Sequence, residues 1–402
     1  MQKTARWTVI ALFLVCPLAP QEQPAASSPA VAVPVRVMDG DRFVDDLTLG
    51  DFEILENLVP QKIQALYLVG KSAILRREAL QEQSPDVSRN FYLLFQMTDY
   101  NPKLAELVDY LIKDVLSPTD SLVLQTPLKT YALSAQALAR KPREAIAQDM
   151  NSLLKKDIKT GSAEYNSLVK DLRRMVINIS GANPSADIES DVSLSAVPQL
   201  EFMLNRYKET QQRVEESRLI DEKKILSFAA ALKKVAGQKH VFFIYQREFR
   251  PQVAPAVMNT MLASYQDQPN VMSDLQDLFQ EYRRDLSLDA DRLGRTFSDA
   301  DAVFHLIFMN KEPERVSGIV LVEQSEDIFR AFSETAKGTG GIVDSSQNPV
   351  AGFKHAMAMS EAYYILYYFP EGGPRDTRFK TITVRLKNRT YSLLHRKGYF
   401  VN

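Results

Sequence analysis

The chain has 402 residues, of which 45% are hydrophobic and 25% are charged, so it can bury a normal core in about two or three domains. Its 49 Lys and Arg residues are balanced by 50 Asp and Glu residues, which leaves no overall positive charge to attract nucleic acid. The single cysteine, Cys16, lies near the start. Its position excludes an internal disulfide, a thiolate metal site and a cysteine nucleophile from the rest of the chain.

The first 26 residues predict an export signal and the start of a linker. Lys3 and Arg6 precede a short apolar run from Trp7 to Val15, which is too short to span a bilayer comfortably. No later segment is apolar over the roughly 18 residues that a membrane span needs. We therefore expect a secreted or periplasmic mature protein with no membrane span. The alternative is an uncleaved signal that anchors an envelope scaffold.

Short alternating runs over 27–70 predict an N-terminal β subdomain. The apolar or alternating stretches Val31–Val37, Phe52–Glu56 and Ile63–Val69 are separated by turn residues. A unit of fewer than about 60 residues has a marginal core, so we expect this one to complete its core against another part of the chain. The polar residues 71–88 are predicted to form a linker.

The segment that follows has the pattern of a βαβ unit. The continuous apolar run Phe91–Phe95 is typical of a strand buried on both faces of a parallel sheet. Pro102 then opens a stretch with apolar residues at helical spacing, and Ser121–Gln125 predicts a second strand. Such units build doubly wound sheets.

Helical patterns dominate residues 141 to about 236, which we interpret as a helical insertion. Apolar runs at 241–245, 302–308 and 362–369 predict further buried strands. We interpret the tyrosines of the last run as core residues. These elements predict an α/β fold over 89–370, with a doubly wound, mostly parallel sheet of the Rossmann type.

The end of the chain, 375–402, predicts a β hairpin with one solvent-exposed face. Phe379–Leu386 alternates in polarity, Asn388 marks a turn, and Tyr391–His395 returns. We expect this hairpin to pack on the N-terminal β subdomain, with the α/β domain inserted between the two in sequence.

Several short motifs occur in the order typical of one bacterial family. They are Asp39-Gly40 after the valine-rich run, Leu47-Thr48 with Asp51-Phe52, Pro60-Gln61-Lys62-Ile63, Gly237-Gln238-Lys239, Thr339-Gly340-Gly341, the Tyr-rich run Tyr363–Phe369, and Arg396-Lys397-Gly398-Tyr399. Over nearly the whole mature chain the sequence resembles the bacterial VWFA-related domain family first described from acidobacteria. The resemblance implies a von Willebrand factor A-like domain, whose usual function is protein binding, often through a divalent metal ion at the C-terminal edge of the sheet.

The residues that would hold this metal ion depart from the family's pattern. Metal-dependent relatives carry D-x-S-x-S after the first buried strand, because Mg²⁺ prefers oxygen ligands and a carboxylate supplies charge. The aligned positions here are Gln96, Thr98 and Tyr100, and Gln246 stands where a second carboxylate belongs after the central strand. The resemblance therefore implies a degenerate metal site.

A shifted alignment makes Asp99 the carboxylate, but Asn101 and Lys103 then replace the serines, and a lysine ammonium opposes a cation. If Mg²⁺ or Mn²⁺ bound, Asp99, Thr98 and Asn101 would be its local ligands. The interpretation we favour is an ordinary loop in which Asp99 or Asn101 caps the helix opened by Pro102. We expect no metal ion and no cofactor.

The sequence predicts an exported, non-enzymatic protein-binding module that acts without metal, with an unidentified protein as its partner and no nucleic acid. Its candidate binding edge consists of the degenerate metal-site positions Gln96, Thr98, Asp99, Tyr100, Asn101 and Gln246. The alternative from another class is an exported hydrolase with catalytic residues in the helical insertion. No G-x-S-x-G motif supports it.

Overall fold

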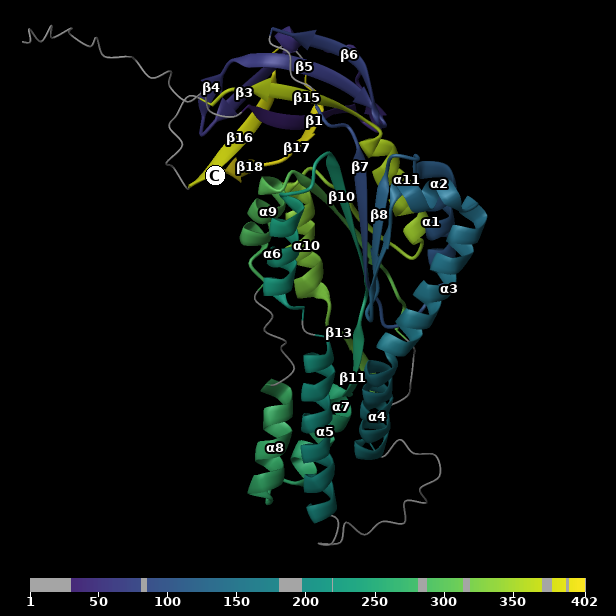
Figure 1. Ribbon diagram of the computed structural model, residues 1–402. Helices are drawn as coiled ribbons and strands as arrows, with labels where there is room; N and C mark the ends of the chain where they lie inside the picture. Colours follow the sequence, from purple (N-terminus) through teal and green to yellow (C-terminus); the bar gives the residue numbers. More distant parts are fainter. Residues whose placement is uncertain are drawn as a thin grey trace, which may run out of the picture.

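The computed structural model describes residues 30–80, 85–180, 197–218, 220–280, 288–313, 319–370, 378–387 and 390–401. Figure 1 shows antiparallel sheets at one end, a central sheet flanked by helices in the middle, and a group of helices at the far end. The export signal predicted over 1–26 lies outside the described residues. Within the described residues, no helix is long and apolar enough to cross a membrane.

The central sheet has six strands in the order β14-β12-β10-β7-β8-β9. The strands are β7 (Arg89–Gln96), β8 (Ser121–Gln125), β9 (Thr130–Leu133), β10 (Gln238–Gln246), β12 (Ala302–Met309) and β14 (Val343–Ser346). All neighbours pair in parallel except β9, which runs antiparallel to β8 at one edge. The sheet is therefore mixed. Because its middle strands are covered on both faces, most of their residues are buried and apolar, and the polar ones lie mainly near the strand ends.

One face of the central sheet buries alternate residues such as Phe91, Leu93 and Phe242 against a first set of helices. This set comprises α1 (Lys103–Tyr110), which continues as a π-helical turn η2 (Leu111–Val115), α2 (Ala135–Arg140), α3 (Arg143–Gly161) and α11 (Pro349–Ser360). The other face buries Val241, Phe243 and their neighbours against a second set. It comprises α6 (Glu222–Leu232), α9 (Ala290–Asp299) and α10 (Glu326–Gly338).

A helical lobe extends beyond the C-terminal edge of the central sheet (Figure 1). It contains α4 (Ala163–Ile179), α5 (Val197–Ser217), α7 (Pro255–Ser264) and α8 (Pro269–Gln280), with the antiparallel pair β11 (Phe249–Val253) and β13 (Ile319–Glu323). One apolar cluster joins α4 and α5 to α7 and α8. Within the span 141–236, α3 and α6 thus contact the central sheet, whereas α4 and α5 contact helices that follow β10.

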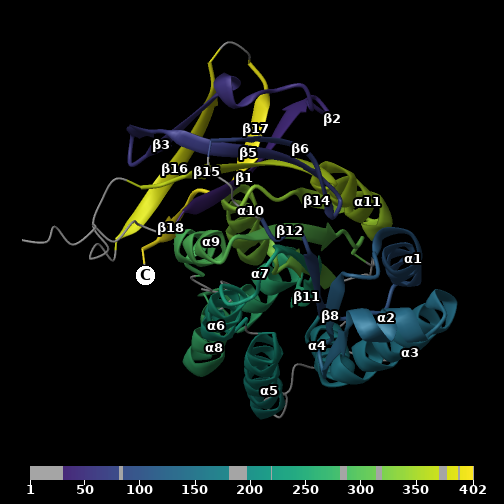
Figure 2. The same cartoon turned by 45° about the horizontal axis from the view of Figure 1, so that its top comes forward.

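Two antiparallel sheets lie across the opposite end of the central sheet (Figure 2). One has the order β17-β1-β15-β5-β6 with β2 paired to β1, and the other has the order β18-β16-β3-β4. Their elements are β1 (Val31–Asp39), β2 (Arg42–Phe43), the short helix η1 (Leu49–Asp51), β3 (Phe52–Glu56), β4 (Val59–Gln61), β5 (Ile63–Gly70), β6 (Ala73–Ala79), β15 (Ala362–Tyr368), β16 (Phe379–Leu386), β17 (Ser392–His395) and β18 (Gly398–Phe400). A shared core of valines, leucines and tyrosines lies between the two sheets.

The predicted fold class, a doubly wound, mostly parallel sheet with a small β subdomain, is wrong. Antiparallel pairing dominates the molecule, since the central sheet is itself mixed and every other sheet is antiparallel. The strand at 362–369 does not join the central sheet, because β15 pairs antiparallel with β1 and β5. Its apolar run does reflect burial on both faces, since alternate residues of β15 belong to two different apolar clusters, but the sheet around it is antiparallel. A run of apolar residues indicates burial and not strand direction.

The predicted C-terminal hairpin also differs from the structure. Strand β16 pairs with β3 and β18, whereas β17 pairs with β1, so the two halves of the predicted hairpin enter different sheets. Each half gains a long-range partner with a matching apolar face, and these contacts replace the local pairing expected from the turn at Asn388, which lies outside the described residues.

Two histidines are buried in adjacent strands of the central sheet. His240 on β10 and His305 on β12 are each 1% exposed, and their ring centroids are 6.0 Å apart. The Nδ1 atom of His305 accepts a hydrogen bond from the backbone N–H of Ile342 at 3.2 Å, so its proton is on Nε2. Burial, with a contribution from Arg36, lowers the pKa of His305 to about 3 and that of His240 well below its usual value.

These histidines predict acid-sensitive folding. His305 stays neutral in the folded chain but protonates near pH 6.5 once unfolded, so its stabilising contribution is complete above pH 6.5 and is lost as the pH falls toward 3. His305→Asn keeps an acceptor for Ile342 and does not titrate. We expect it to reduce the slope of unfolding free energy against pH by about 1.4 kcal/mol per pH unit between about pH 6 and 4. Urea unfolding at several pH values measures this slope.

The matched control is His355→Asn, because the His355 side chain is 49% exposed. It should keep the wild-type slope. An unchanged slope in His305→Asn would contradict the assignment of acid sensitivity to the buried pair.

Candidate functional site

The predicted binding edge lies where the strands of the central sheet end and the helical lobe begins (Figure 1). Gln96 ends β7 and pairs with Tyr245, and Gln246 ends β10 and pairs with Met309 at the end of β12. The segments that follow these three parallel strands therefore converge at one edge. Such an edge is where open α/β sheets commonly bind ligands.

Gln246 holds the loop after β7 in place. Its Oε1 atom accepts hydrogen bonds from the Thr98 backbone N–H at 3.1 Å, the Thr98 hydroxyl at 2.9 Å and the Asp99 backbone N–H at 2.9 Å. Gln246 is 6% exposed and Thr98 is 4% exposed, so water does not readily replace these bonds. From the lobe, the Asn166 side chain donates to the Thr98 carbonyl at 2.8 Å. A neutral amide oxygen thus satisfies the donors of this loop.

Asp99 faces a lysine from the segment after β12. The Lys311 ammonium lies 2.5 Å from Asp99 Oδ2, and both side chains are close to half exposed. An exposed pair of this kind contributes at most about 1 kcal/mol to stability. The pair opposes metal binding, since a divalent cation at Asp99 would have to displace an ammonium that carries the same sign of charge. Within the described residues, no group of three or more His, Cys, Asp or Glu side chains could hold a metal ion.

The structure brings Thr98, Asp99 and Gln246 together and gives the other predicted residues different surroundings. Tyr100 packs against the core on the α1 face of the sheet. Asn101 accepts a hydrogen bond from the Lys103 N–H at 2.9 Å, at the start of α1. Gln96 is half-buried at the end of its strand. Asn101 therefore has a hydrogen-bonding role at the start of α1.

A cavity of about 160 Å³ opens beside this edge and was not predicted from the sequence. Its apolar wall combines side chains from three elements of the lobe. They are Tyr165 and Val169 on α4, Phe249 and Pro251 on β11, and Ile319 and Leu321 on β13. Charged residues complete the lining, namely Asp99, Arg173, Arg247, Glu248, Lys311 and Glu312. The sequence offered one signal for this cavity, namely the charged residues Lys311 and Glu312 shortly after the buried strand β12.

A buried ion pair supports the wall of this cavity. Arg218 Nε donates to Glu248 Oε1 at 2.6 Å, and the Tyr245 hydroxyl donates to the same oxygen at 2.5 Å. The guanidinium also lies over the ring of Tyr165 at 5.2 Å. Burial alone would lower the pKa of Arg218, but Glu248 and the two tyrosines raise it above its usual value. The lobe is thereby attached to the end of the central strand by a contact that is costly to break.

No model of a protein family matches this chain, and no curated protein and no solved structure matches it either.

Replacing Gln246 tests its role in holding the loop. Gln246→Leu leaves the buried Thr98 N–H and hydroxyl, and the partly buried Asp99 N–H, without their acceptor. We expect a loss of about 2 kcal/mol in unfolding free energy, measured by urea unfolding. Gln246→Glu keeps an acceptor and should lose less.

The control for this experiment is Gln125→Leu, at the exposed end of β8, which pairs with the other side of β7. It should leave stability within about 0.5 kcal/mol of wild type. Equal stability of Gln246→Leu and wild type would show that the loop does not depend on this amide.

Proposed function

We propose that this chain is an exported protein-binding module without enzymatic activity, and that it binds its partner without a metal ion. The relation to the VWFA-related family and the export to the periplasm or the medium rest on sequence motifs alone. The observation that carries the binding proposal is the cavity beside the Asp99–Lys311 pair, at an edge where three strand ends converge. No observation in the described part of the chain favours the hydrolase alternative.

The size and lining of this cavity suit one anchoring side chain of a partner protein. Pockets for cofactors and drug-sized ligands have volumes of about 300–1,000 Å³, larger than the 160 Å³ available here. An apolar wall surrounded by charged groups matches the arrangement of interface hot spots, in which one buried apolar or aromatic residue provides much of the affinity. The partner is therefore expected to insert an apolar side chain against Val169, Ile319 and Leu321.

The charges at the rim support binding without metal. Lys311 neutralises Asp99, and Arg247 Nε lies 3.1 Å from Glu323 Oε1. Asp99 and Glu323 thus each have a cationic neighbour from the protein itself. Such rim pairs select partners by charge complementarity and contribute little affinity themselves.

A charge placed on the cavity wall should abolish partner binding. Tagged protein is incubated with the envelope fraction of the producing cells, and bound proteins are quantified by mass spectrometry. We expect Leu321→Asp to reduce recovery of the partner at least about tenfold, since a desolvated carboxylate would replace the anchor contact. EDTA should not change recovery.

Val320→Asp is the control, because Val320 is 39% exposed on the same strand and does not line the cavity. It should recover the partner as wild type does. Equal recovery by Leu321→Asp and wild type would rule out this cavity as the binding site.

Calorimetric titration with Mg²⁺ or Mn²⁺ tests the absence of metal from the mechanism. We expect no stoichiometric binding heat for the wild type, and no change in Asp99→Ala. Lys311→Ala removes the competing ammonium and is the variant in which weak binding should first appear. Tight binding to the wild type that Asp99→Ala abolishes would refute metal-independent recognition.

A further inference from the structure

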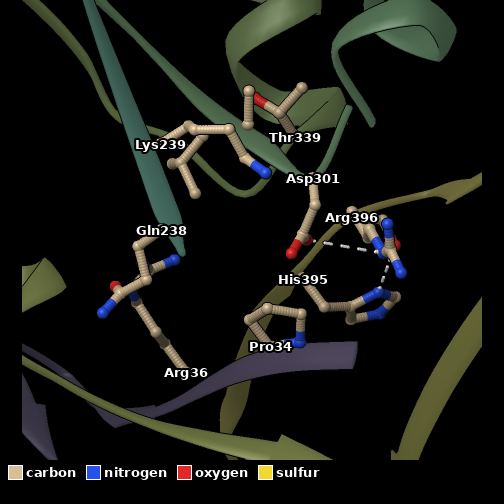
Figure 3. Close-up of a pocket in the computed structure, with 10 residues that line it drawn as sticks. Pro34, Arg36, Gln238, Lys239, Asp301, Thr339, His395 and Arg396 are labelled. Carbon is tan, nitrogen blue, oxygen red and sulfur yellow. Dashed lines mark hydrogen bonds and ion pairs between the residues drawn. The ribbon is translucent and has the colours of Figure 1, made fainter. Parts of the chain in front are cut away.

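A second, smaller cavity lies at the opposite edge of the central sheet, between the starts of β10 and β12 and the antiparallel strand β1. Its volume is about 20 Å³. Figure 3 shows residues from separate parts of the chain around it, with Lys239, Asp301 and Arg396 directed toward a common space. Because β1, β10 and β17 belong to two different sheets, this cavity lies at their junction.

Positive charge exceeds negative charge at this cavity. Arg36, Lys239 and Arg396 line it, whereas Asp301 is the one carboxylate among its described lining residues. Arg396 Nε lies 3.6 Å from Asp301 Oδ1, and Lys239 Nζ donates to the Val235 carbonyl at 2.9 Å. A backbone carbonyl accepts a hydrogen bond but carries no net charge. Two cations are therefore not neutralised by the described lining residues.

Arg36 differs from the other buried arginines of the described residues. Arg89 pairs with Asp120 at 2.6 Å, Arg218 pairs with Glu248, and Arg250 pairs with Glu215. Arg36 is 3% exposed, and among the described residues it has no carboxylate within ion-pair distance and no hydrogen-bond partner for its Nε. Its Cζ lies 5.9 Å from the ring centroid of Tyr363.

An unpaired buried guanidinium is costly, since desolvating an ion costs several kcal/mol unless a partner of opposite charge offsets it. Burial lowers the pKa of Arg36 to about 10, so the group still carries its charge at neutral pH. Burial lowers the pKa of Lys239 as well, and Arg396 adds to that effect. Asp301 acts against this lowering of the pKa at both groups, and Asp86 does so at Lys239, but the one lining carboxylate does not balance three lining cations.

We propose that this cavity binds a small monovalent inorganic anion of the size of chloride, held by Arg36 together with Lys239 and Arg396. A volume of about 20 Å³ admits one or two water-sized bodies, so a monatomic anion fits it better than phosphate or sulfate does. The bound anion joins β1 and the end of β17 to the starts of β10 and β12. It stabilises the junction between the sheets and does not depend on the proposed partner site at the other edge.

The test compares thermal unfolding of the full chain in chloride with unfolding in gluconate, which is too large for the cavity. Chloride replaces gluconate up to about 0.2 M at constant ionic strength, and we expect the wild-type midpoint to rise by about 3 °C. Arg36→Met should abolish the rise. Arg385→Met removes an arginine from an exposed position of β16 and should keep it.

Crystals soaked in bromide provide a second measurement on the wild type, which decides the question even if Arg36→Met does not fold. We expect an anomalous peak between Arg36 and Lys239. Equal midpoints in chloride and gluconate, or a cavity that holds water only, would overturn the proposal.

Discussion

The antiparallel pairing of β15 with β1 and β5 is the contact on which the arrangement of the chain depends. Val31 to Val35 pair with Tyr368 to Tyr364, and Ile63 to Gly70 pair along the other side of β15. Since β15 directly follows α11, which packs on the central sheet, this pairing fixes the antiparallel sheets to the α/β part. Without it, the N-terminal strands would lose their link through β15 to α11, although β17 would still pair with β1 and β16 with β3.

The tyrosines of β15 make this pairing specific. The Tyr364 hydroxyl accepts from the Leu47 N–H at 3.1 Å and donates to the Val44 carbonyl at 2.9 Å. The Tyr368 hydroxyl donates to Glu56 at 2.6 Å, and Tyr399 donates to the same carboxylate oxygen at 2.8 Å. The buried rings of Tyr364 and Tyr368 fill the core, and the hydrogen bonds of their hydroxyls also fix the register of the strands.

The sequence allowed the positions of the strands to be predicted more reliably than their partners. The runs at 91–95, 241–245 and 302–308 all lie within strands of the central sheet, because long apolar stretches report burial on both faces. The same signal at 362–369 belongs to an antiparallel sheet. At the proposed binding edge, Gln246 and Thr98 do meet. Lys311, however, contacts Asp99 across 212 positions of the sequence, a separation that no local pattern encodes.

The pairing of β1 also constrains how the chain folds during synthesis. The hydrogen bond from Leu47, shortly after β1, to Tyr364 on β15 spans 317 positions. Strand β17, the partner on the other side of β1, lies even later in the sequence. The apolar strand β1 is therefore synthesised early, but its two partner strands, β15 and β17, are absent until almost the entire chain has been synthesised. Contacts of such length slow folding and leave apolar strand edges open to wrong pairing. This protein is expected to need protection from aggregation until its last strands emerge.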